Sequence, residues 1–172
     1  MILRKLQEKD AVRMLEWMHD PQTVQHLQKD FAHMTLDDCM RFVAAAQDTG
    51  QSMHMSVCDD QDVYQGTISL KNIDPENRNA EYAVSMHGDA QGKGFAAFGT
   101  REILKIAFET LNLEKVYLNV LEDNPRAIRF YEKMNFHREG VFVKHIYQDG
   151  RYKDLLWYCM FRTEYLNGLT GR

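Results

Sequence analysis

The sequence predicts an α/β protein with a mixed sheet that is mostly antiparallel and has one parallel pair of strands in its middle. Apolar residues recur at helical spacing in four segments and alternate in several others, which separates helices from strands. Three strand patterns follow one another closely in the middle of the chain and can form an antiparallel meander. The strands expected over 81–86 and 115–121 flank a long helix, so they should be parallel with a right-handed crossover.

The expected order is strand, two helices, three strands, helix, strand, helix and two strands. Residues 2–6 are expected to form the first strand. The apolar stripe of the first helix runs from Ala11 to Met18 at positions i, i+3, i+4 and i+7. Asp20-Pro21 ends this helix, because the residue before a proline is pushed out of helical geometry.

The second helix is expected to begin at Thr35, whose hydroxyl can cap it. Asp38 follows three residues on and completes an imperfect capping box. Thr49-Gly50 is expected to end the helix. Strands follow over residues 53–58, 63–70 and 81–86, with an acidic turn over 59–62 and a polar loop over 72–79.

In the second half of the chain, a long helix is expected over 94–111 and a strand over 115–121. The next helix, over 124–134, has Pro125 in its first turn, where the missing N–H costs nothing. The chain closes with a hairpin, whose turn contains Asp149-Gly150 and whose strands are expected over 141–147 and 152–161.

Length and charge narrow the class of protein. A single domain over residues 1–172 is expected, since the length suits one domain and no internal repeat is visible. The formal net charge of -4 argues against nucleic acid as the main partner. No apolar run approaches the roughly 20 residues that a membrane helix needs, and the charged N-terminus does not resemble a signal peptide. We therefore expect a soluble, cytoplasmic protein that does not bind a membrane.

The cysteines point away from disulfide and zinc chemistry. Cys39, Cys58 and Cys159 are widely spaced and include no CxxC pair. We expect them to be small buried side chains. No metal is expected.

A glycine-bearing segment, Gln91-Gly92-Lys93-Gly94-Phe95-Ala96, lies between a strand and the start of the long helix. Glycines let the backbone approach a ligand closely. The first turn of a helix has unpaired N–H groups and a partial positive charge, which can bind a pyrophosphate. The alternative interpretation is a purely structural turn.

Two familiar nucleotide-binding motifs do not fit this segment. A P-loop requires Ser or Thr after its lysine, but Gly94 follows Lys93. A dinucleotide-binding fingerprint requires a third glycine, and Ala97 stands at that place.

The segment instead resembles the Gln/Arg-x-x-Gly-x-Gly/Ala signature of the GNAT superfamily of N-acetyltransferases. A second segment, from Asn124 to Phe136, resembles the family pattern Asn-x-x-Ala-x-x-x-Tyr-x-x-x-Gly-Phe. Asn135 stands where the family usually has glycine, and asparagine is the best substitute at a left-handed helix end. The resemblance runs over residues 79–165. Its closing hairpin, from Tyr147 to Tyr152, looks like the branch that acetylates polyamines and ribosomal-protein N-termini.

The resemblance implies a GNAT fold with acetyl-CoA as cosubstrate, bound by residues 79–165, while residues 1–70 shape the substrate pocket. It implies that the strand over 83–85 bulges and splays from the strand over 115–121, which exposes an N–H to the acetyl oxygen. Asn124 would bond the pantetheine arm or a nearby water, and Ala127 leaves room for that arm. The implied cofactor-binding residues are Ala83, Val84, Ser85, Gln91, Gly92, Lys93, Gly94, Phe95, Ala96, Ala97, Asn124, Ala127 and Tyr131.

Acetyl transfer to an amine needs an acid for the leaving thiolate and a base for the acceptor ammonium. The resemblance implies that Tyr131 is the acid, and a phenol with a pKa of about 10 is protonated at neutral pH; an ordinary buried aromatic is the alternative. Glu81 stands where related enzymes often have a glutamate base, with a solvated strand-end glutamate as the alternative. His87 and His54 are rival bases.

The acceptor is expected to be a primary amine of a polyamine, a protein N-terminus, or an amino sugar or small metabolite. Acidic residues near the expected site, among them Glu122 and Asp123, suit a cation. The edge of the closing hairpin offers backbone groups to a second subunit, which would make a homodimer. The rival function is a non-catalytic acyl-CoA-binding sensor, against which the retention of Tyr131 and Glu81 argues.

Overall fold

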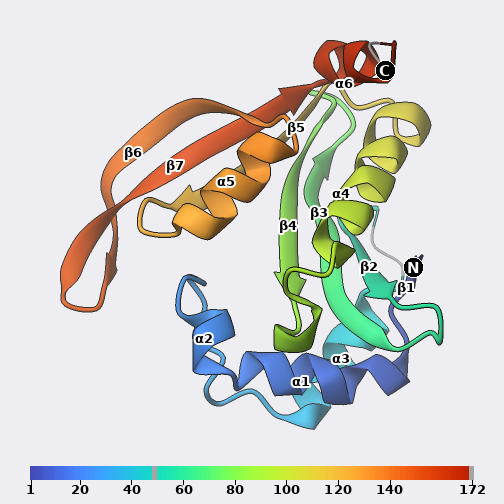
Figure 1. Cartoon of the computed structure of the whole chain (residues 1–172), viewed down its shortest axis with the longest axis vertical. Helices are drawn as coiled ribbons and strands as arrows, with labels where there is room; N and C mark the ends of the chain where they lie inside the picture. Colours follow the sequence, from blue (N-terminus) through green and yellow to red (C-terminus); the bar gives the residue numbers. More distant parts are fainter. Residues whose placement is uncertain (48–49, 171–172) are drawn as a thin grey trace.

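A computed structural model describes residues 1–47 and 50–170 (Figure 1). Its described strands form one seven-stranded sheet in the order β1-β2-β3-β4-β5-β7-β6. The strands are β1 (Ile2–Lys5), β2 (Met53–Cys58), β3 (Tyr64–Asp74), β4 (Asn79–Met86), β5 (Lys115–Leu121), β6 (His137–Gln148) and β7 (Arg151–Phe161). The α-helices are α1 (Ala11–Met18), α2 (Pro21–Val24), α3 (Leu36–Ala45), α4 (Phe95–Lys105), α5 (Pro125–Lys133) and α6 (Arg162–Thr170).

The pairing of β4 with β5 is parallel, and all other neighbouring strands are antiparallel. The prediction of a mixed sheet with one parallel pair is therefore confirmed. The parallel pair is short, because only the residues from Asn79 to Glu81 pair with the residues from Lys115 to Tyr117. Beyond Glu81 the two strands diverge and leave an opening in the sheet, as the resemblance implied.

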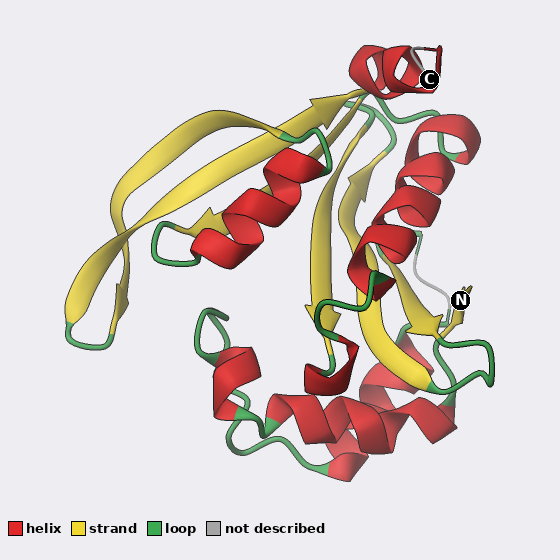
Figure 2. Cartoon of the chain, viewed as in Figure 1, coloured by secondary structure: helices red, strands yellow, loops and turns green. Residues whose placement is uncertain are grey.

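Two apolar clusters hold the helices on the sheet. Helix α4 packs on β2, β3 and β4, and the main cluster between the helix and the sheet includes the fully buried Ile68, Ile103 and Phe108. Helices α1 and α3 pack on each other and enclose a second cluster that includes Met14 and Tyr64. In Figure 2, α4 and α5 lie to either side of the opening, with α1, α2 and α3 gathered at one end of the sheet.

Several local predictions are confirmed in detail. Thr35 and Asp38 form the predicted capping box, in which the side chain of each accepts from the backbone N–H of the other. The hairpin between β6 and β7 turns at Asp149 and Gly150, which both have positive φ, as a two-residue type I′ turn requires. Asn135 has a φ of 66°, so it takes the left-handed conformation for which the family usually uses glycine.

Other boundaries differ from the prediction. Pro21 does end α1, but it also begins the short helix α2, whose first turn Asp20 caps. Strand β3 extends to Asp74 and therefore includes part of the predicted 72–79 loop. The long helix changes to a wider π-helical turn (Ile106–Thr110) after Lys105. Helix α3 ends at Ala45, while Thr49, where we expected it to stop, lies outside the described residues.

The structure also adds α6, which the sequence did not predict, and lengthens the first strand of the hairpin. Strand β6 begins at His137 rather than at Val141. Within the described residues, no helix is both long and apolar enough to cross a membrane.

Candidate active site

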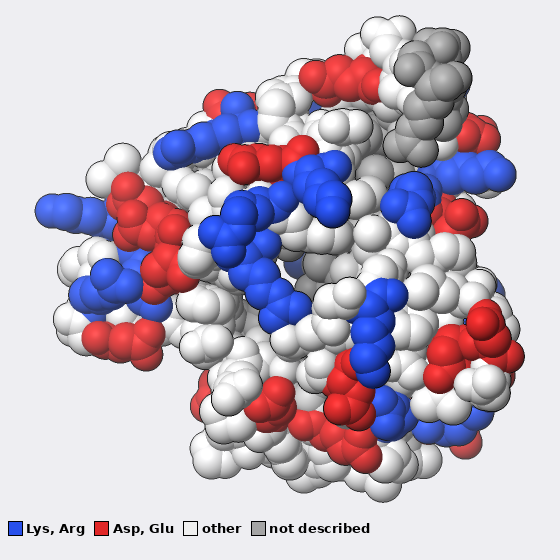
Figure 3. Space-filling model, in the orientation of Figure 1, with Lys and Arg blue, Asp and Glu red and all other residues white. Residues whose placement is uncertain are grey.

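A cleft of about 1090 Å³ opens between α4 and α5 and extends to the segment around α2. Its lining brings together most of the predicted cofactor-binding residues, from the strand before the loop and from both sequence motifs, although the motifs are separated by a helix and a strand. These residues are Val84, Ser85, Gln91, Gly92, Gly94, Ala96, Ala97, Asn124, Ala127 and Tyr131. Figure 3 shows the hollow, with Lys and Arg side chains along its edge.

The loop before α4 presents backbone groups to this cleft. Gly92 and Gly94 have φ values of 74° and 86°, a region that disfavours side chains. Gly94 is the N-cap of α4, so the first N–H groups of an 11-residue helix have no partners within the helix. Ala96 and Ala97 line the cleft at this first turn. The arrangement suits a diphosphate, because these N–H groups and the positive end of the helix dipole point to the same place.

The remaining loop residues have different positions. The Phe95 side chain is buried in the main core, so only its backbone is available to a ligand. Lys93 is exposed and does not line the cleft. The Gln91 side chain accepts a hydrogen bond from Arg126 in α5, which joins the two motifs across the cleft.

Strand β4 forms the floor of the cleft with Val84, Ser85 and Met86. The bulge that the resemblance implied over 83–85 is absent, since these residues pair with β3 in continuous register. The register shift lies instead between Lys71 and Asp74 of β3. Strand β4 nevertheless has free N–H groups beyond Glu81, because β5 diverges from it there and no longer pairs with it.

The direction of these free groups follows from a neighbouring hydrogen bond. The His87 N–H donates to the Gln65 carbonyl of β3 at 2.8 Å. Because bonding directions alternate along a strand, the N–H groups of Val84 and Met86 point away from β3 and towards the opening. Ala83 does not line the cleft.

Asn124 is first of all a helix cap. Its side-chain oxygen accepts from the Ala127 N–H at 3.1 Å and thereby begins α5. The amide NH₂ group is left as a donor at the cleft wall. Ala127 lines the cleft in the first turn of the helix, and its small side chain leaves space for a ligand there.

Tyr131 places a phenol at the bottom of the cleft. Its side chain is 8% exposed, and its ring packs edge-on against the ring of Tyr82, with 6.1 Å between the ring centroids. No residue in the described ranges forms a hydrogen bond with its hydroxyl group, whereas the hydroxyls of Tyr64, Tyr82, Tyr158 and Tyr165 all have partners. Burial raises the pKa of Tyr131 to about 12. The phenol is therefore fully protonated at neutral pH and free to donate into the cleft.

Glu81 lies away from this cleft. Side chains alternate along a strand, so Glu81 projects from the face opposite to Tyr82 and Tyr131. Its carboxylate accepts from Lys71 at 2.8 Å and from Asn72 at 3.0 Å. The structure thus brings together the predicted acid and the loop, but it does not bring Glu81 to them.

The two rival bases also lie outside the cleft lining. The His87 ring bonds Glu16 at 3.0 Å and accepts from the Asp89 N–H. His54 bonds Ser69 at 2.8 Å, and burial lowers the pKa of its imidazole.

Sequence motifs alone missed two groups of cleft residues. The first consists of basic side chains on the two flanking helices, namely Arg101, Lys105, Arg126 and Lys133. The spacing of Arg126 and Lys133, seven residues apart on one helix, places them on one face and could have indicated a role. The second consists of Gln25, His26 and Leu27 beyond α2, and no local pattern marks that segment.

The cleft fits coenzyme A on the chemistry of its lining. The α4 N-terminus and the basic side chains suit the phosphates, and the free N–H groups of β4 suit the amides of a pantetheine arm. The described residues contain no cluster of three or more His, Cys, Asp or Glu side chains that could hold a metal ion.

Comparison with known proteins agrees with this geometry. Residues 1–137 match the family described as Acetyltransferase (GNAT) domain, and the chain belongs to that family. A spermidine N(1)-acetyltransferase of Vibrio cholerae is 36% identical over 102 residues, which are 59% of each chain. A putative ribosomal N-acetyltransferase of Bacillus subtilis is 31% identical over 58% of this chain and 55% of that protein.

The solved structures extend the likeness over nearly the whole chain. The spermidine N-acetyltransferase of Vibrio cholerae in complex with CoA and spermine has a TM-score of 0.87 and 27% identity, over 96% of this chain and 98% of that one. The curated spermidine acetyltransferases match over only 54–59% of their own length. The solved structure and the family match together show that the fold is that of the GNAT acetyltransferases.

Proposed function

We propose that this chain is an acetyl-CoA-dependent N-acetyltransferase whose acceptor is a primary amine of a polyamine such as spermidine. The observation that carries the proposal is the unbonded, protonated phenol of Tyr131 in the same cleft as the open N-terminus of α4. A phosphate site and a proton donor in one cleft are what transfer from a coenzyme A thioester requires.

Acetyl-CoA, when bound, supplies the thioester whose acyl carbon the amine attacks. The N–H groups of Gly94 to Ala97 hold the diphosphate, and Arg126 adds a positive charge beside it. Val84 and Met86 offer N–H groups to the thioester carbonyl or to the pantetheine amides. Asn124 offers its NH₂ group to the same arm.

Tyr131 acts as the general acid. The thiolate of coenzyme A leaves as the carbon–sulfur bond breaks, and the phenol donates its proton to the sulfur. Transfer from an acid in this position typically contributes about 10²–10⁴-fold to the rate. Glu81 stays a predicted proton acceptor for the ammonium of the acceptor, and replacement by Gln tests that role.

A polyamine suits the surroundings of the cleft. A second pocket of about 670 Å³ adjoins it, and its lining contains three carboxylates, those of Asp30, Asp123 and Asp149, together with the ammonium groups of Lys29 and Lys153. Phe31 and Tyr147 line the same pocket, and aromatic rings attract organic cations. The names of the spermidine-acetylating relatives support the same class of acceptor.

A panel of amines with acetyl-CoA tests the proposal. We expect thiol release and a product heavier by one acetyl group with spermidine and spermine, and slower turnover with a peptide N-terminus and glucosamine. Coenzyme A binding without thiol release from any amine would instead identify a non-catalytic acyl-CoA sensor. Preferred turnover of the peptide or the sugar would overturn the polyamine assignment alone.

A further inference from the structure

Three residues separate the coenzyme A cleft from the second pocket. Gln25, His26 and Leu27 line both cavities. The segment is tied down on either side of His26, because the Gln25 carbonyl accepts from Gln148 at 3.2 Å and Gln28 donates to Asn119 at 2.9 Å. An acceptor that reaches the cleft from the second pocket therefore passes the His26 side chain.

The ring of His26 faces a carboxylate without bonding it. Its Nδ1 lies 3.6 Å from Oδ1 of Asp123, which precedes the cap residue of α5. Both atoms are buried and lack hydrogen-bond partners, which in the described part of the chain is otherwise true only of the indole nitrogen of Trp157. A buried polar atom without a partner is costly. The pair is thus one small movement away from a hydrogen bond that both atoms need.

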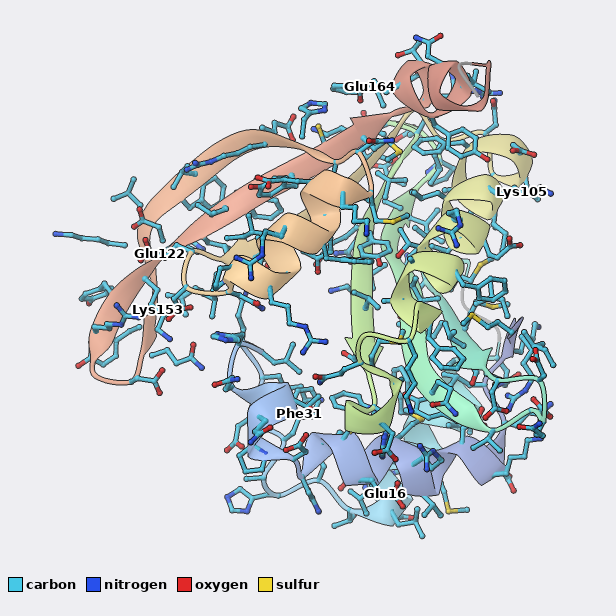
Figure 4. All side chains as sticks on the ribbon, in the orientation of Figure 1. Glu16, Phe31, Lys105, Glu122, Lys153 and Glu164 are labelled. Carbon is cyan, nitrogen blue, oxygen red and sulfur yellow. The ribbon has the colours of Figure 1, made fainter. Side chains whose placement is uncertain are left out.

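The other oxygen of Asp123 is fully engaged. Its Oδ2 accepts from Arg151 and from Lys153, each at 2.8 Å, and Lys153 is only 2% exposed. Burial acts to raise the pKa of the Asp123 carboxyl, but the hydrogen bond and charge of Lys153 outweigh it and lower the pKa. Asp123 therefore keeps its negative charge and can stabilise a positive imidazole at Oδ1. Figure 4 labels Lys153 and Phe31, two of the residues that line the second pocket.

We propose that His26 is a further catalytic residue, which accepts the proton of the acceptor ammonium, and that Asp123 is the positioning residue that orients its imidazole. The inference rests on the proposed acetyl transfer. The ammonium N–H bond breaks, and its proton moves to Nε2 of His26, the ring nitrogen that does not face Asp123. The neutral amine then attacks the thioester carbon, and Tyr131 protonates the thiolate that leaves. The attacking nitrogen still carries one proton too many, and that proton passes to the Tyr131 phenolate, which restores the phenol. The histidine returns its extra proton to water, so the cycle closes without another reactant.

Other charged groups around His26 enter the pH dependence of this step. From the β5–α5 connection and the hairpin they are Asp123, Asp149, Arg151 and Lys153, and from the same segment they are Lys29 and Asp30. Lys153 is paired with both Asp123 and Asp149. Among the described residues, the carboxylate oxygen paired with the His26 ring is Oδ1 of Asp123, 3.6 Å from Nδ1.

The test compares the pH dependence of kcat/KM for the wild type and for His26→Gln, Asp123→Asn and Glu81→Gln, with the best acceptor from the amine panel. We expect His26→Gln to lower kcat at least 100-fold and to remove the acid-side fall of the wild-type profile. Asp123→Asn should lower kcat less, and added imidazole should partly restore a His26→Gly variant. His33→Gln is the matched control, since His33 is exposed in the same connection between α2 and α3.

Melting temperature and calorimetric binding of coenzyme A show whether each variant is folded and loaded. A folded His26→Gln variant that keeps the wild-type kcat and profile overturns the inference and leaves the proposed function intact. A change confined to Glu81→Gln does the same and assigns the base to Glu81. A wild type that acetylates no amine in the panel overturns both proposals.

Discussion

The guanidinium of Arg126 donates to the side-chain oxygen of Gln91, and this contact closes the gap between the two motifs. Gln91 begins the loop before α4, and Arg126 lies in the first turn of α5. Both side chains line the cleft beside the N-terminus of α4. A diphosphate bound there competes with Gln91 for the guanidinium, since a phosphate is the stronger acceptor.

Arg126→Ala should therefore weaken coenzyme A binding about tenfold, which corresponds to about 1.4 kcal/mol. Calorimetry with coenzyme A at two ionic strengths measures the effect, and the loss should be smaller at high salt. Arg138→Ala serves as the control, because Arg138 is exposed on β6 outside the cleft lining. Equal affinity for wild type and Arg126→Ala would remove Arg126 from the phosphate site.

Tyr131 and Tyr82 provide a matched pair of buried phenols. Tyr82 donates to or accepts from Thr100 at 2.7 Å, whereas the Tyr131 hydroxyl has no partner in the described ranges. We expect Tyr131→Phe to lower kcat at least tenfold while stability and coenzyme A affinity stay unchanged. Tyr82→Phe should show the reverse, with a loss of about 1 kcal/mol in the free energy of unfolding and nearly normal kcat.

The pH profile gives a second check on Tyr131. With a pKa of about 12, this phenol stays protonated throughout the usual assay range. The wild-type profile should therefore show no alkaline fall from Tyr131 below about pH 11. An alkaline limb near pH 9 that disappears in Tyr131→Phe would contradict the burial that the structure gives this ring.

Much of the sheet could be predicted because its signals are local. Strand β5 has the predicted bounds, since its alternation is continuous and its ends are marked by polar residues. The parallel pairing of β4 and β5 followed from chain connectivity alone. Helix α6 could not be predicted, because its sequence lacks an apolar stripe. It is held by tertiary contacts, such as the 5.0 Å ring contact of Tyr165 with Phe108.

The residues of the candidate site also divide into those with a local sequence signal and those placed by tertiary contacts. The loop before α4 and the Asn124–Tyr131 face could be predicted, because each motif is contiguous. The position of Glu81 depends on which face of β4 carries the side chains that pack against α5, and this follows only once Tyr82 is known to contact Tyr131. His26 could not be found at all from sequence, because its role depends on a loop and a hairpin that meet across the fold.

Gly94 should tolerate no side chain at low cost. Its φ of 86° is unfavourable for alanine by roughly 1–2 kcal/mol, although no atom lies closer than 3.8 Å to an added Cβ. Gly94→Ala should therefore lower the free energy of unfolding by about that amount and weaken coenzyme A binding, as read by denaturant titration and calorimetry. Gly140→Ala is the control, since Gly140 has open space and no positive φ. Equal behaviour of the two variants would contradict a conformational role for Gly94.

The capping box of α3 should make stability depend on acid. The pKa of Asp38 is lowered to about 2 by hydrogen bonds from the side chain and N–H of Thr35 and by Arg41. The unfolded chain binds the proton more readily, so the contribution of Asp38 is complete above about pH 4 and is lost as pH falls towards 2. Asp38→Asn should lower the melting temperature at pH 6 and reduce its further fall between pH 4 and 2. Asp37→Asn, which removes only an exposed ion pair with Arg41, should keep the wild-type slope; if both variants flatten the curve equally, the acid dependence does not come from the capping box.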